Sequence, residues 1–503
     1  MFPLSRILDR AATLYGDAPA VAEDAARLTY RALGQRVAAL AGGLAARGIG
    51  PGDRIAILAR NSFRYLEANL ACARAGIVLV PLNTRLAAAE IDRILALTEA
   101  KLLLQALPYH APVAAVVWDD NDPPGADNAY ERLLGSGEPL AQPVAVKPDD
   151  VAQIFVTSGT TGEPKGVCLS ERNLLTSALD SIIALELNRD DVWLHAPPMF
   201  HLVDAFAIWA ITLMGGKHVI AHFDPQGFGP LVARERVTKT SLPPTLLDMI
   251  VRDSPIDRSD LTSLDRISYG GAPMPDAVYE RCTVALGCDL LQAYGITETS
   301  GLVCQQLPRD LRRHDGARYN SVGQPAVHVD LDLVDESGRS LPSGEIGEFV
   351  IAGSRVMTGY WRNPEATALA LRGGWYHTGD LGLRDADGHY TIVGRKKDKI
   401  ITGGENVYPV EVENVLIAHP AVAEAAVFGV PNERWGEEVR AVVFLHPGAS
   451  AAAAELIEHC RGWIGGYKIP RAIEFSPEPL PKSGPGKIAK GPLRASYCKV
   501  PVS

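Results

Sequence analysis

Residues 151–166 read VAQIFVTSGTTGEPKG. The first six are apolar and β-branched enough for a buried strand. The ten from Thr157 to Gly166 hold three glycines, four hydroxyl side chains and Lys165. Glycine lets backbone amides approach an anion closely, and successive amides in such a turn form an anion-binding concavity. The stretch therefore predicts a strand that runs into a polyphosphate-binding loop, a geometry typical of α/β proteins.

The spacing excludes the phosphate loop of kinases and GTPases. That loop reads G-x-x-x-x-G-K-S/T, and its last hydroxyl holds Mg²⁺. Here Lys165 is followed by Gly166, so the metal-binding hydroxyl is missing. A solvent loop rich in turn formers is the simpler alternative, but such loops rarely combine this density of glycine and hydroxyls with a lysine.

Composition indicates a globular enzyme of several structural units. The chain has 503 residues, of which 47% are hydrophobic and 21% charged, so we expect two to four units. A net charge of −10 argues against a nucleic-acid partner. Seven scattered cysteines without a C-x-x-C pair predict free thiols in a reducing cytoplasm.

Nothing in the sequence predicts a transmembrane segment. The first fifteen residues have apolar positions at helical spacing rather than the pattern of a secretion signal. The longest mainly apolar run, 205–214, is too short to span a bilayer. Four arginines between 309 and 318 favour a solvated surface over a patch for a membrane or for phosphate groups. Monomer and homodimer both stay open.

Strand-like and helix-like segments alternate over the first three hundred residues, which predicts parallel sheets flanked by helices. The strand-like segments are 54–58, 77–80, 113–118, 151–156, 217–220 and 265–269, and helical segments include 30–46 and 65–75. From about Arg318, short strands separated by Gly, Pro and Asp predict a small β unit.

The C-terminal part predicts a separate α+β domain. Its segments 410–419, 423–428, 439–445, 452–464 and 473–475 read as α-β-β-α-β. It follows the charge run 395–399 and the pair Gly403-Gly404, a combination suited to a hinge. We expect an N-terminal domain of residues 1–396 and a mobile C-terminal domain of residues 397–503.

Four further motifs follow the phosphate loop in order: QAYGITET (292–299), WYHTGDL (375–381), GRKKDKI (394–400) and PKSGPGKIAK (481–490). Together with the loop they resemble the adenylate-forming superfamily, which includes acyl-CoA synthetases, peptide-synthetase adenylation domains and firefly luciferase. The resemblance covers essentially the whole chain. It implies an N-terminal domain of two doubly wound αβαβα subdomains with a small β-barrel-like subdomain, and a mobile C-terminal domain.

The resemblance also implies an ATP site. Tyr294 is expected to stack on adenine, Thr297 to donate to the α-phosphate, and Glu298 to bind Mg²⁺. Asp380, read as a turn residue, and Arg395 are expected to bind the ribose hydroxyls. Core, turn or solvated-surface roles remain as simpler alternatives for Tyr294, Asp380 and Arg395. The complete predicted nucleotide set is Thr157, Ser158, Gly159, Thr160, Thr161, Gly162, Lys165, Gly271, Ala272, Pro273, Tyr294, Gly295, Asp380 and Arg395.

Lys487 is the residue that we expect to carry the first half-reaction. A carboxylate that attacks the α-phosphate brings two anions together, so a cation must bridge them as charge develops. Lys487 matches the lysine of the family's final motif. A solvated lysine on a basic tail is the alternative.

The second half-reaction requires a thiol at the same carbonyl, and the resemblance implies that the small domain rotates to admit it. Lys397 matches the hinge position, and Gly403 and Gly404 match the loop that lines the pantetheine tunnel. Trp435 is expected to pack on pantetheine, unless it is an ordinary half-buried aromatic. We further expect CoA nucleotide contacts from Arg85, Tyr467 and Lys468.

The acid pocket is predicted by position in the same family. His201 is expected to gate or contact the carboxylate rather than act as a base, because the acid is already ionised at pH 7. A satisfied core histidine is the alternative. Asp204 departs from the glycine often found in relatives, and the sequence leaves open whether it faces the pocket. The expected lining residues are mostly small, which hints at a roomy site: Leu202, Val203, Ser241, Gly270, Ala293, Ser300 and Gly301.

These observations predict an AMP-forming acyl-CoA synthetase that uses ATP, Mg²⁺ and CoA and activates a medium- or long-chain fatty acid or an aryl acid. An adenylation enzyme that loads a separate carrier protein is the alternative within the fold. A luciferase-like oxygenase has no distinguishing residue here. A non-catalytic nucleotide-binding protein would be expected to have lost Lys487, Glu298 or the phosphate loop, and all three are present.

Overall fold

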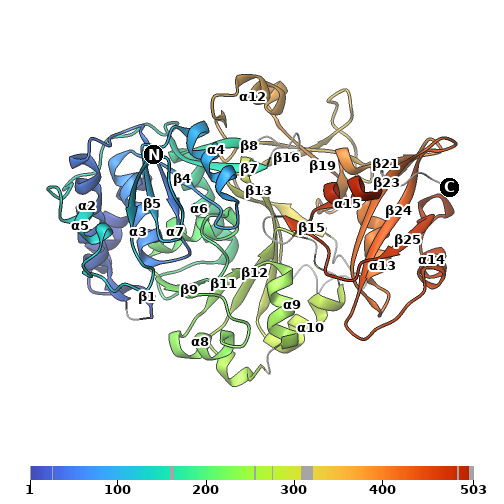
Figure 1. Ribbon diagram of the computed structural model, residues 1–503, viewed down its shortest axis with the longest axis horizontal. Helices are drawn as coiled ribbons and strands as arrows, with labels where there is room; N and C mark the ends of the chain where they lie inside the picture. Colours follow the sequence, from blue (N-terminus) through green and yellow to red (C-terminus); the bar gives the residue numbers. More distant parts are fainter. Residues whose placement is uncertain are drawn as a thin grey trace.

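The computed structural model describes residues 2–24, 26–158, 164–253, 256–272, 274, 276–307, 321–483 and 487–497. A large α/β part is followed along the chain by a small α+β part, and the two lie side by side in Figure 1. In the described residues, every helix is too short or too polar to cross a bilayer. The predicted fold class is confirmed by this arrangement.

The first sheet has seven strands in the order β18-β8-β7-β4-β3-β5-β6. Alternate residues of β3 enter two different cores, Ile55 and Ile57 on one face and Ala56 and Leu58 on the other. Burial on both faces explains the nearly continuous apolar strands. Strand bounds are β3 (Arg54–Leu58), β4 (Val78–Pro81), β5 (Leu102–Gln105), β6 (Ala114–Val117), β7 (Val151–Ser158), β8 (Pro164–Ser170) and β18 (Gly359–Tyr360). Helices of this region are α2 (Tyr30–Ala46), α3 (Phe63–Ala75), α4 (Ala88–Thr98), α5 (Ala129–Leu134) and α6 (Glu171–Leu185).

The second sheet has thirteen strands in the order β16-β17-β19-β20-β15-β14-β13-β12-β11-β9-β10-β1-β2. It is parallel from β1 to β13 and antiparallel from β14 to β16. The change of sequence texture near Arg318 thus falls within the antiparallel half. Strand bounds are β1 (Pro19–Glu23), β2 (Ala26–Thr29), β9 (Val192–His195), β10 (Lys217–Ile220), β11 (Lys239–Leu242), β12 (Arg266–Gly270), β13 (Asp289–Ile296), β14 (Gly301–Gln306), β15 (Ser321–Pro325), β16 (Asp330–Val334), β17 (Gly347–Ala352), β19 (Tyr376–Arg384) and β20 (Tyr390–Arg395).

Further helices lie before or between the strands of the second sheet. The first helix of the chain, α1, packs its buried residues Ile7, Leu8 and Ala11 into the same core as α7. The helices are α1 (Ile7–Tyr15), α7 (Leu202–Met214), α8 (Phe228–Glu235), α9 (Pro244–Asp253), α10 (Asp276–Leu286) and α12 (Pro364–Ala370), and 3₁₀ turns include η3 (Thr297–Thr299) and η5 (Lys396–Asp398).

The small part has a core of its own, which includes Ile400, Val412 and Val427. Its predicted α-β-β-α-β order is confirmed, with two short strands added in front and a hairpin and helix behind. The elements are β21 (Ile400–Thr402), β22 (Glu405–Val407), α13 (Pro409–Ile417), β23 (Val422–Asn432), β24 (Gly436–Leu445), α14 (Ala453–Arg461), β25 (Ala472–Phe475), β26 (Lys482–Ser483), β27 (Lys487–Ile488) and α15 (Lys490–Tyr497).

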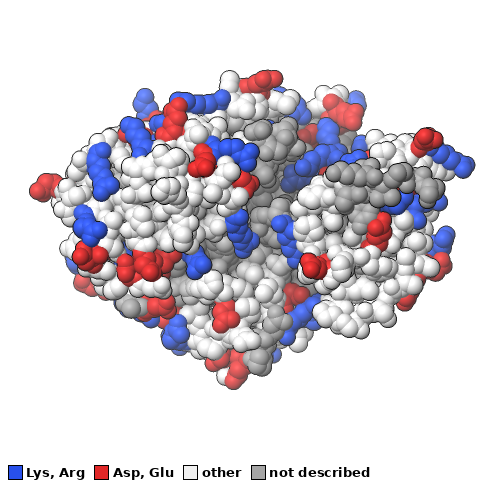
Figure 2. All heavy atoms as spheres, viewed as in Figure 1, with Lys and Arg blue, Asp and Glu red and all other residues white. Residues whose placement is uncertain are grey.

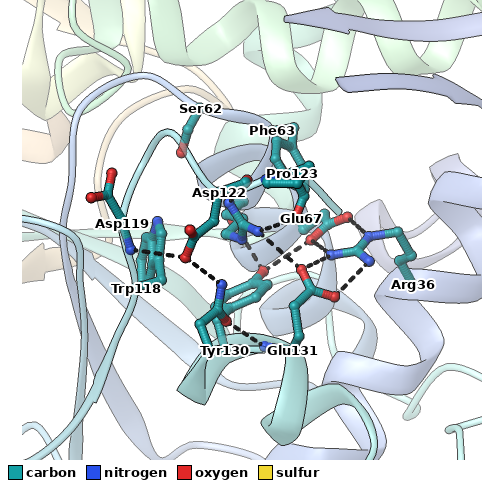
Figure 3. Close-up of polar contacts among 12 residues, drawn as sticks. Arg36, Ser62, Phe63, Glu67, Trp118, Asp119, Asp122, Pro123, Tyr130 and Glu131 are labelled. Carbon is teal, nitrogen blue, oxygen red and sulfur yellow. Dashed lines mark hydrogen bonds and ion pairs between the residues drawn. The ribbon is translucent and has the colours of Figure 1, made fainter. Parts of the chain in front are cut away.

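A buried network of charges joins α2, α3 and α5. Figure 3 shows Arg36 between the carboxylates of Glu67 and Glu131. The Arg36 Nε lies 2.5 Å from Glu67 Oε1, and its Nη2 lies 2.8 Å from Glu131 Oε1. The Tyr130 hydroxyl donates to Glu67 over 3.1 Å. Because the Glu67 side chain is fully buried, its charge is compensated only by these partners.

Replacing Glu67 with glutamine should lower the free energy of unfolding by about 3 kcal/mol, because Arg36 then faces an amide in a buried site. Urea-induced unfolding measures the change. Glu458, which forms an exposed pair with Arg461, is the matched control. Its replacement by glutamine should change stability by less than about 1 kcal/mol. Equal urea midpoints for the two variants would contradict the role given to the network.

Candidate functional site

The predicted phosphate loop is the tip of a β-hairpin. Strands β7 and β8 pair antiparallel, with Thr157 opposite Lys165 and Ser158 opposite Pro164. The hairpin geometry differs from the strand-to-helix turn of a kinase-type loop, in agreement with the spacing argument. Gly159, Thr160, Thr161 and Gly162 lie outside the described residues, as does the side chain of Ser158. Their phosphate contacts therefore stay predictions.

Lys165 points from the hairpin toward an aromatic residue of the neighbouring strand. Its Nζ lies 5.1 Å from the centre of the Tyr360 ring, a cation–π contact. Tyr360 is on β18, which pairs with β8. The lysine is thus held at the base of the loop by the face of a ring.

Three residues predicted for nucleotide binding form one cluster. The Tyr294 hydroxyl donates to Asp380 Oδ2 over 2.5 Å, and Arg395 Nε lies 2.5 Å from Asp380 Oδ1. Tyr294 comes from β13, Asp380 from β19 and Arg395 from β20. Burial and the Asp380 carboxylate hold the pKa of Tyr294 well above its usual range, so its phenol stays a neutral donor.

The prediction that Asp380 lies at a turn is wrong. Asp380 is inside β19, directly opposite Arg395 of β20. The glycine before it, Gly379, has φ of +71°. Glycine is typical of turns because it adopts positive φ, so Gly379 and the turn-forming residues around it predicted a turn within what is a continuous strand.

Glu298 is a half-buried carboxylate close to this cluster. It lies in η3, directly after β13, and accepts a hydrogen bond of 3.0 Å from the Tyr360 hydroxyl. Burial raises its pKa, and the Tyr360 bond, Arg395 and Lys165 partly oppose that rise. Thr297, expected at the α-phosphate, precedes Glu298 in the same turn.

The surroundings of Glu298 fit a magnesium ion that is shared with a substrate. No group of three or more potential ligand side chains occurs among the residues that the structure describes. Mg²⁺ in nucleotide enzymes is commonly held by one or two carboxylates, with phosphates and water completing its shell. A single half-buried carboxylate beside the predicted phosphate loop matches that donor set.

A hollow separates the two parts of the molecule, and Lys and Arg side chains gather on both of its sides (Figure 2). Such a concentration of positive charge raises the local concentration of polyanionic ligands. The hollow is therefore lined by basic side chains even though the net charge of the chain is −10.

The predicted acid pocket collects residues from the carboxyl ends of β11, β12 and β13. Gly270 lies beside Ala293 in the sheet register, and Ser241 is on the next strand. A Cβ atom at Gly270 would lie 2.2 Å from the Ala293 carbonyl oxygen, so only glycine fits there. Ligands of open α/β sheets bind at this edge.

A second set of predicted lining residues comes from the start of α7 and from β14. A Cβ atom at Gly301 would lie 3.9 Å from the Leu202 Cβ, so the two are neighbours, and Val203 follows Leu202 in α7. Ser300 contributes no free hydroxyl, because its fully buried side chain donates to the Arg355 carbonyl. Gly295 packs against Gly301: a Cβ atom at Gly295 would lie 2.3 Å from the Gly301 carbonyl oxygen.

His201 caps the start of α7 and is neutral at pH 7. Burial and the nearby Arg85 lower its pKa to about 4. A base this weak agrees with the expectation that it contacts rather than deprotonates the acid. Asp204 does not face a pocket as a free charge: its buried carboxylate binds Trp193 Nε1 over 3.0 Å and His195 Nδ1 over 2.7 Å.

Two of the residues predicted for the CoA tunnel are in contact. The Gly403 amide donates to the Trp435 carbonyl, and a Cβ at Gly403 would lie 3.0 Å from the Trp435 ring. Gly403 and Gly404 both have positive φ. Lys468 is engaged by Glu411, with Nζ 2.6 Å from Oε1, and Tyr467 and Trp435 are partly exposed.

The predicted hinge is bracketed by two anchors. Lys396 pairs over 3.3 Å with Glu348 of β17, whose other oxygen accepts from the Gly379 amide. Ile400, four residues later, is buried in the core of the small part. Lys397 lies between these anchors. Lys487 is in β27, opposite Ser483, and its side chain lies outside the described residues. Of the predicted segment Gly271-Ala272-Pro273, Pro273 also lies outside them.

Tyr360 and Glu348 were not predicted from the sequence as parts of the site. Tyr360 lies 62 positions from Glu298, and Glu348 lies 48 from Lys396. A Gly-Tyr-Trp run at 359–361 was the only local signal for Tyr360. Both contacts arise from strand pairing, which no short spacing in the sequence reveals.

Known proteins resemble this chain over its full length. The feruloyl-CoA synthase of Amycolatopsis sp is 40% identical, with 97% of this chain and 98% of that protein covered. The indoleacetate–CoA ligase of Aromatoleum aromaticum is 36% identical, with 98% and 97% covered. The solved o-succinylbenzoate CoA synthetase of Bacillus subtilis, in complex with its acyl-adenylate, has a TM-score of 0.87 at 29% identity and 99% coverage of both chains.

Two family models match successive parts of the chain. The pattern described as AMP-binding enzyme matches residues 8–361, and the pattern described as AMP-binding enzyme C-terminal domain matches residues 411–487. The first alone covers well over half of the 503 residues. The chain therefore belongs to the AMP-binding enzyme family.

Proposed function

We propose that this protein is an AMP-forming acid–CoA ligase that activates an aryl or medium- to long-chain carboxylic acid with ATP and then transfers it to CoA. The observation that carries the proposal is the Tyr294–Asp380–Arg395 cluster beside the half-buried Glu298. This cluster matches a ribose and a metal–phosphate site at the edge where α/β sheets bind nucleotides.

In the first half-reaction, an acid oxygen attacks the α-phosphorus of ATP and pyrophosphate leaves. Asp380 and Arg395 hold the ribose, Tyr294 covers the adenine, and Lys165 with the hairpin tip holds the departing phosphates. Lys487 neutralises the charge that develops between carboxylate and α-phosphate. A magnesium ion held by Glu298 and phosphate oxygens would supply further charge neutralisation.

In the second half-reaction, the CoA thiol attacks the acyl carbonyl and AMP leaves. We propose that the small part, residues 397–503, turns about Lys397 between the two steps. Gly403, Gly404 and Trp435 then line the path of the thiol arm, and Arg85, Tyr467 and Lys468 contact the CoA nucleotide. The Gly403–Trp435 contact supports a preformed tunnel wall.

The acid is best sought among aryl acids. The relatives at 40% and 36% identity are named for ferulate and indoleacetate. The predicted pocket is lined mainly by small residues such as Gly270, Ala293 and Gly301, which leaves room for a ring. We place the enzyme in the cytoplasm, since six described cysteines are all unpaired.

A panel of cinnamic, indole and straight-chain acids tested for AMP and thioester formation, with and without CoA, tests the function. We expect AMP release to require an acid and CoA together, with an aryl acid preferred. Rapid AMP release only with an added acyl-carrier protein would overturn CoA as the acceptor. ATP turnover independent of any acid would overturn the function as a whole.

Replacing Tyr360 with phenylalanine should raise the half-saturating Mg²⁺ concentration roughly tenfold, because a hydrogen bond to a charged carboxylate is lost. The bond favours ionised Glu298, so its loss raises a pKa that burial has already raised. A raised carboxyl pKa means that the metal-binding form is lost as the pH falls, and in the variant it should be lost at a higher pH. AMP formation as a function of Mg²⁺ at several pH values measures both effects. Identical Mg²⁺ curves would refute this role for Tyr360.

A further inference from the structure

Five fully buried polar side chains form a continuous chain behind the start of α7. Asp204 accepts from Trp193 and meets His195, whose Nε2 lies 2.8 Å from His218 Nδ1. The chain ends at Thr212, 3.0 Å from His218 Nε2. The proposed reaction uses none of these groups. A buried polar chain of this length must be fully satisfied to be tolerated.

The direction of each hydrogen bond follows from the Thr212 end. The Thr212 hydroxyl donates its single proton to the Ile208 carbonyl, 2.6 Å away, so it must accept from His218 Nε2. Burial and the neighbouring His195 hold the pKa of His218 far below its usual range, so its Nδ1 is unprotonated and accepts from His195 Nε2.

His195 then carries a proton on Nε2, which donates to His218, and its Nδ1 forms a second hydrogen bond of 2.7 Å with Asp204 Oδ2. Both side chains of this pair are fully buried. Removing one partner of such a pair is far more damaging than replacing it with a group of the same shape that keeps the bonds.

The contact between His195 and Asp204 joins the two ends of the segment 196–203. His195 ends β9 and Asp204 is in the first turn of α7, so the eight residues 196–203 form a closed loop between them, here called the acyl loop. It contains His201, Leu202 and Val203. Pro197 and Pro198 remove two amide donors from it, so the loop depends on outside partners to fix its backbone.

The side chain of Asn61 supplies hydrogen-bond partners for the backbone of the acyl loop. Its Nδ2 donates to the His195 carbonyl over 2.9 Å and to the Pro197 carbonyl over 2.7 Å, and its Oδ1 accepts from the Met199 amide over 2.7 Å. Asn61 directly precedes the Ser62 cap of α3, a helix buried along its whole length. The acyl loop is thereby tied to a rigid element of the first sheet.

We propose that Asn61, His195 and Asp204 are positioning residues that preset the acyl loop, and that they determine affinity for the acid without contributing to ATP binding. The inference rests on the proposed function, because it takes the acyl loop as one wall of the acid pocket. His201 and Leu202 would be displaced together when any tie is cut.

Asn61→Asp tests the tie to α3. Aspartate keeps the shape and the Met199 bond but loses both donors and faces two carbonyls, so KM for the acid should rise roughly tenfold or more. KM for ATP in acid-dependent pyrophosphate exchange should stay within about twofold. The matched control is Asn69→Asp within α3, whose amide binds Tyr65 and Gln153 instead. An unchanged acid KM in Asn61→Asp, or a parallel rise in the KM of ATP, overturns the proposal.

The proton on His195 Nε2 gives a readout that needs no substrate. In ¹⁵N-histidine-labelled protein, the His195 signal, assigned by its loss in His195→Gln, should show a protonated Nε2 at pH 7.5. In Asp204→Asn the amide can donate to Nδ1 and still accept from Trp193, so Nε2 should keep its proton. This variant should fold and keep the acid KM within about threefold, whereas Asp204→Ala leaves both partners unpaired and should raise it by more than tenfold.

An unprotonated His195 Nε2 in the unaltered protein overturns the proton assignment, and equal acid KM values for the two Asp204 variants overturn the positioning role. Failure of the proposed function gives a different result: no acid would support turnover in the unaltered protein, while the His195 signal would still show the protonated Nε2. The two failures are therefore distinguishable.

Discussion

Replacing Lys487 with alanine should lower the rate of acyl-adenylate formation roughly 10²- to 10³-fold, the usual effect of removing a group that stabilises developing charge. The lysine is expected to bridge two anions as they approach, so its loss acts on kcat more than on the KM of either substrate. Pyrophosphate exchange with a saturating acid measures the step.

Thioester formation from preformed acyl-adenylate is the internal control for this variant. The charge has already been neutralised in that intermediate, so the Lys487→Ala rate should stay within about threefold of the unaltered protein. Equal losses in both steps would contradict a role restricted to adenylation. Lys490 is a suitable neighbouring control, because its Nζ is held 2.6 Å from Glu413 within the small part.

Replacing Lys397 with proline should lower the thioester step about a hundredfold and leave adenylation within about threefold, because proline fixes φ at the proposed point of rotation. Lys396 is tied to Glu348 and Ile400 is buried, so the proposed rotation falls on the three residues between them, 397–399. Single-turnover assays of each half-reaction separate the two rates.

Lys397→Ala is the matched control, since it removes the same charge and leaves φ free. It should keep both half-reactions near their original rates. Overall thioester synthesis at the normal rate in the proline variant would refute the hinge at this position. A loss of adenylation in the proline variant would show instead that the substitution distorts Arg395, two residues earlier.

Periodicity predicted the elements better than the contacts between them. The helix 30–46 and the strands 54–58 and 217–220 have the predicted bounds, because their hydrophobic patterns coincide with burial on one or two faces. The order of the small part was also readable from local pattern. The pairing of strands far apart in the chain was not predictable in this way, because the sequence does not show that β14 joins the antiparallel strands to the parallel sheet.

The site was predictable residue by residue where a motif carried it, but its geometry was not. Tyr294 and Asp380 were each expected to bind ATP, yet their mutual bond spans 86 positions. Asp204 was ambiguous because its partners Trp193 and His195 lie on a strand before it, and only the packing of α7 on that strand brings them within 3.0 Å. Whether a buried acid is costly or satisfied depends on such partners.

The two anchors around Lys397, the Lys396–Glu348 pair and the buried Ile400, also indicate where two related enzymes can be joined into a chimera. The pairs Asp380–Arg395 and Glu348–Lys396 are complete before position 397, and the small part's own core begins at Ile400. A recombination joint placed at 397–399 would leave each parent's charge pairs and core intact. Acid selectivity and thiol delivery could then be inherited from different parents, which makes this short stretch a natural seam for building chimeric ligases.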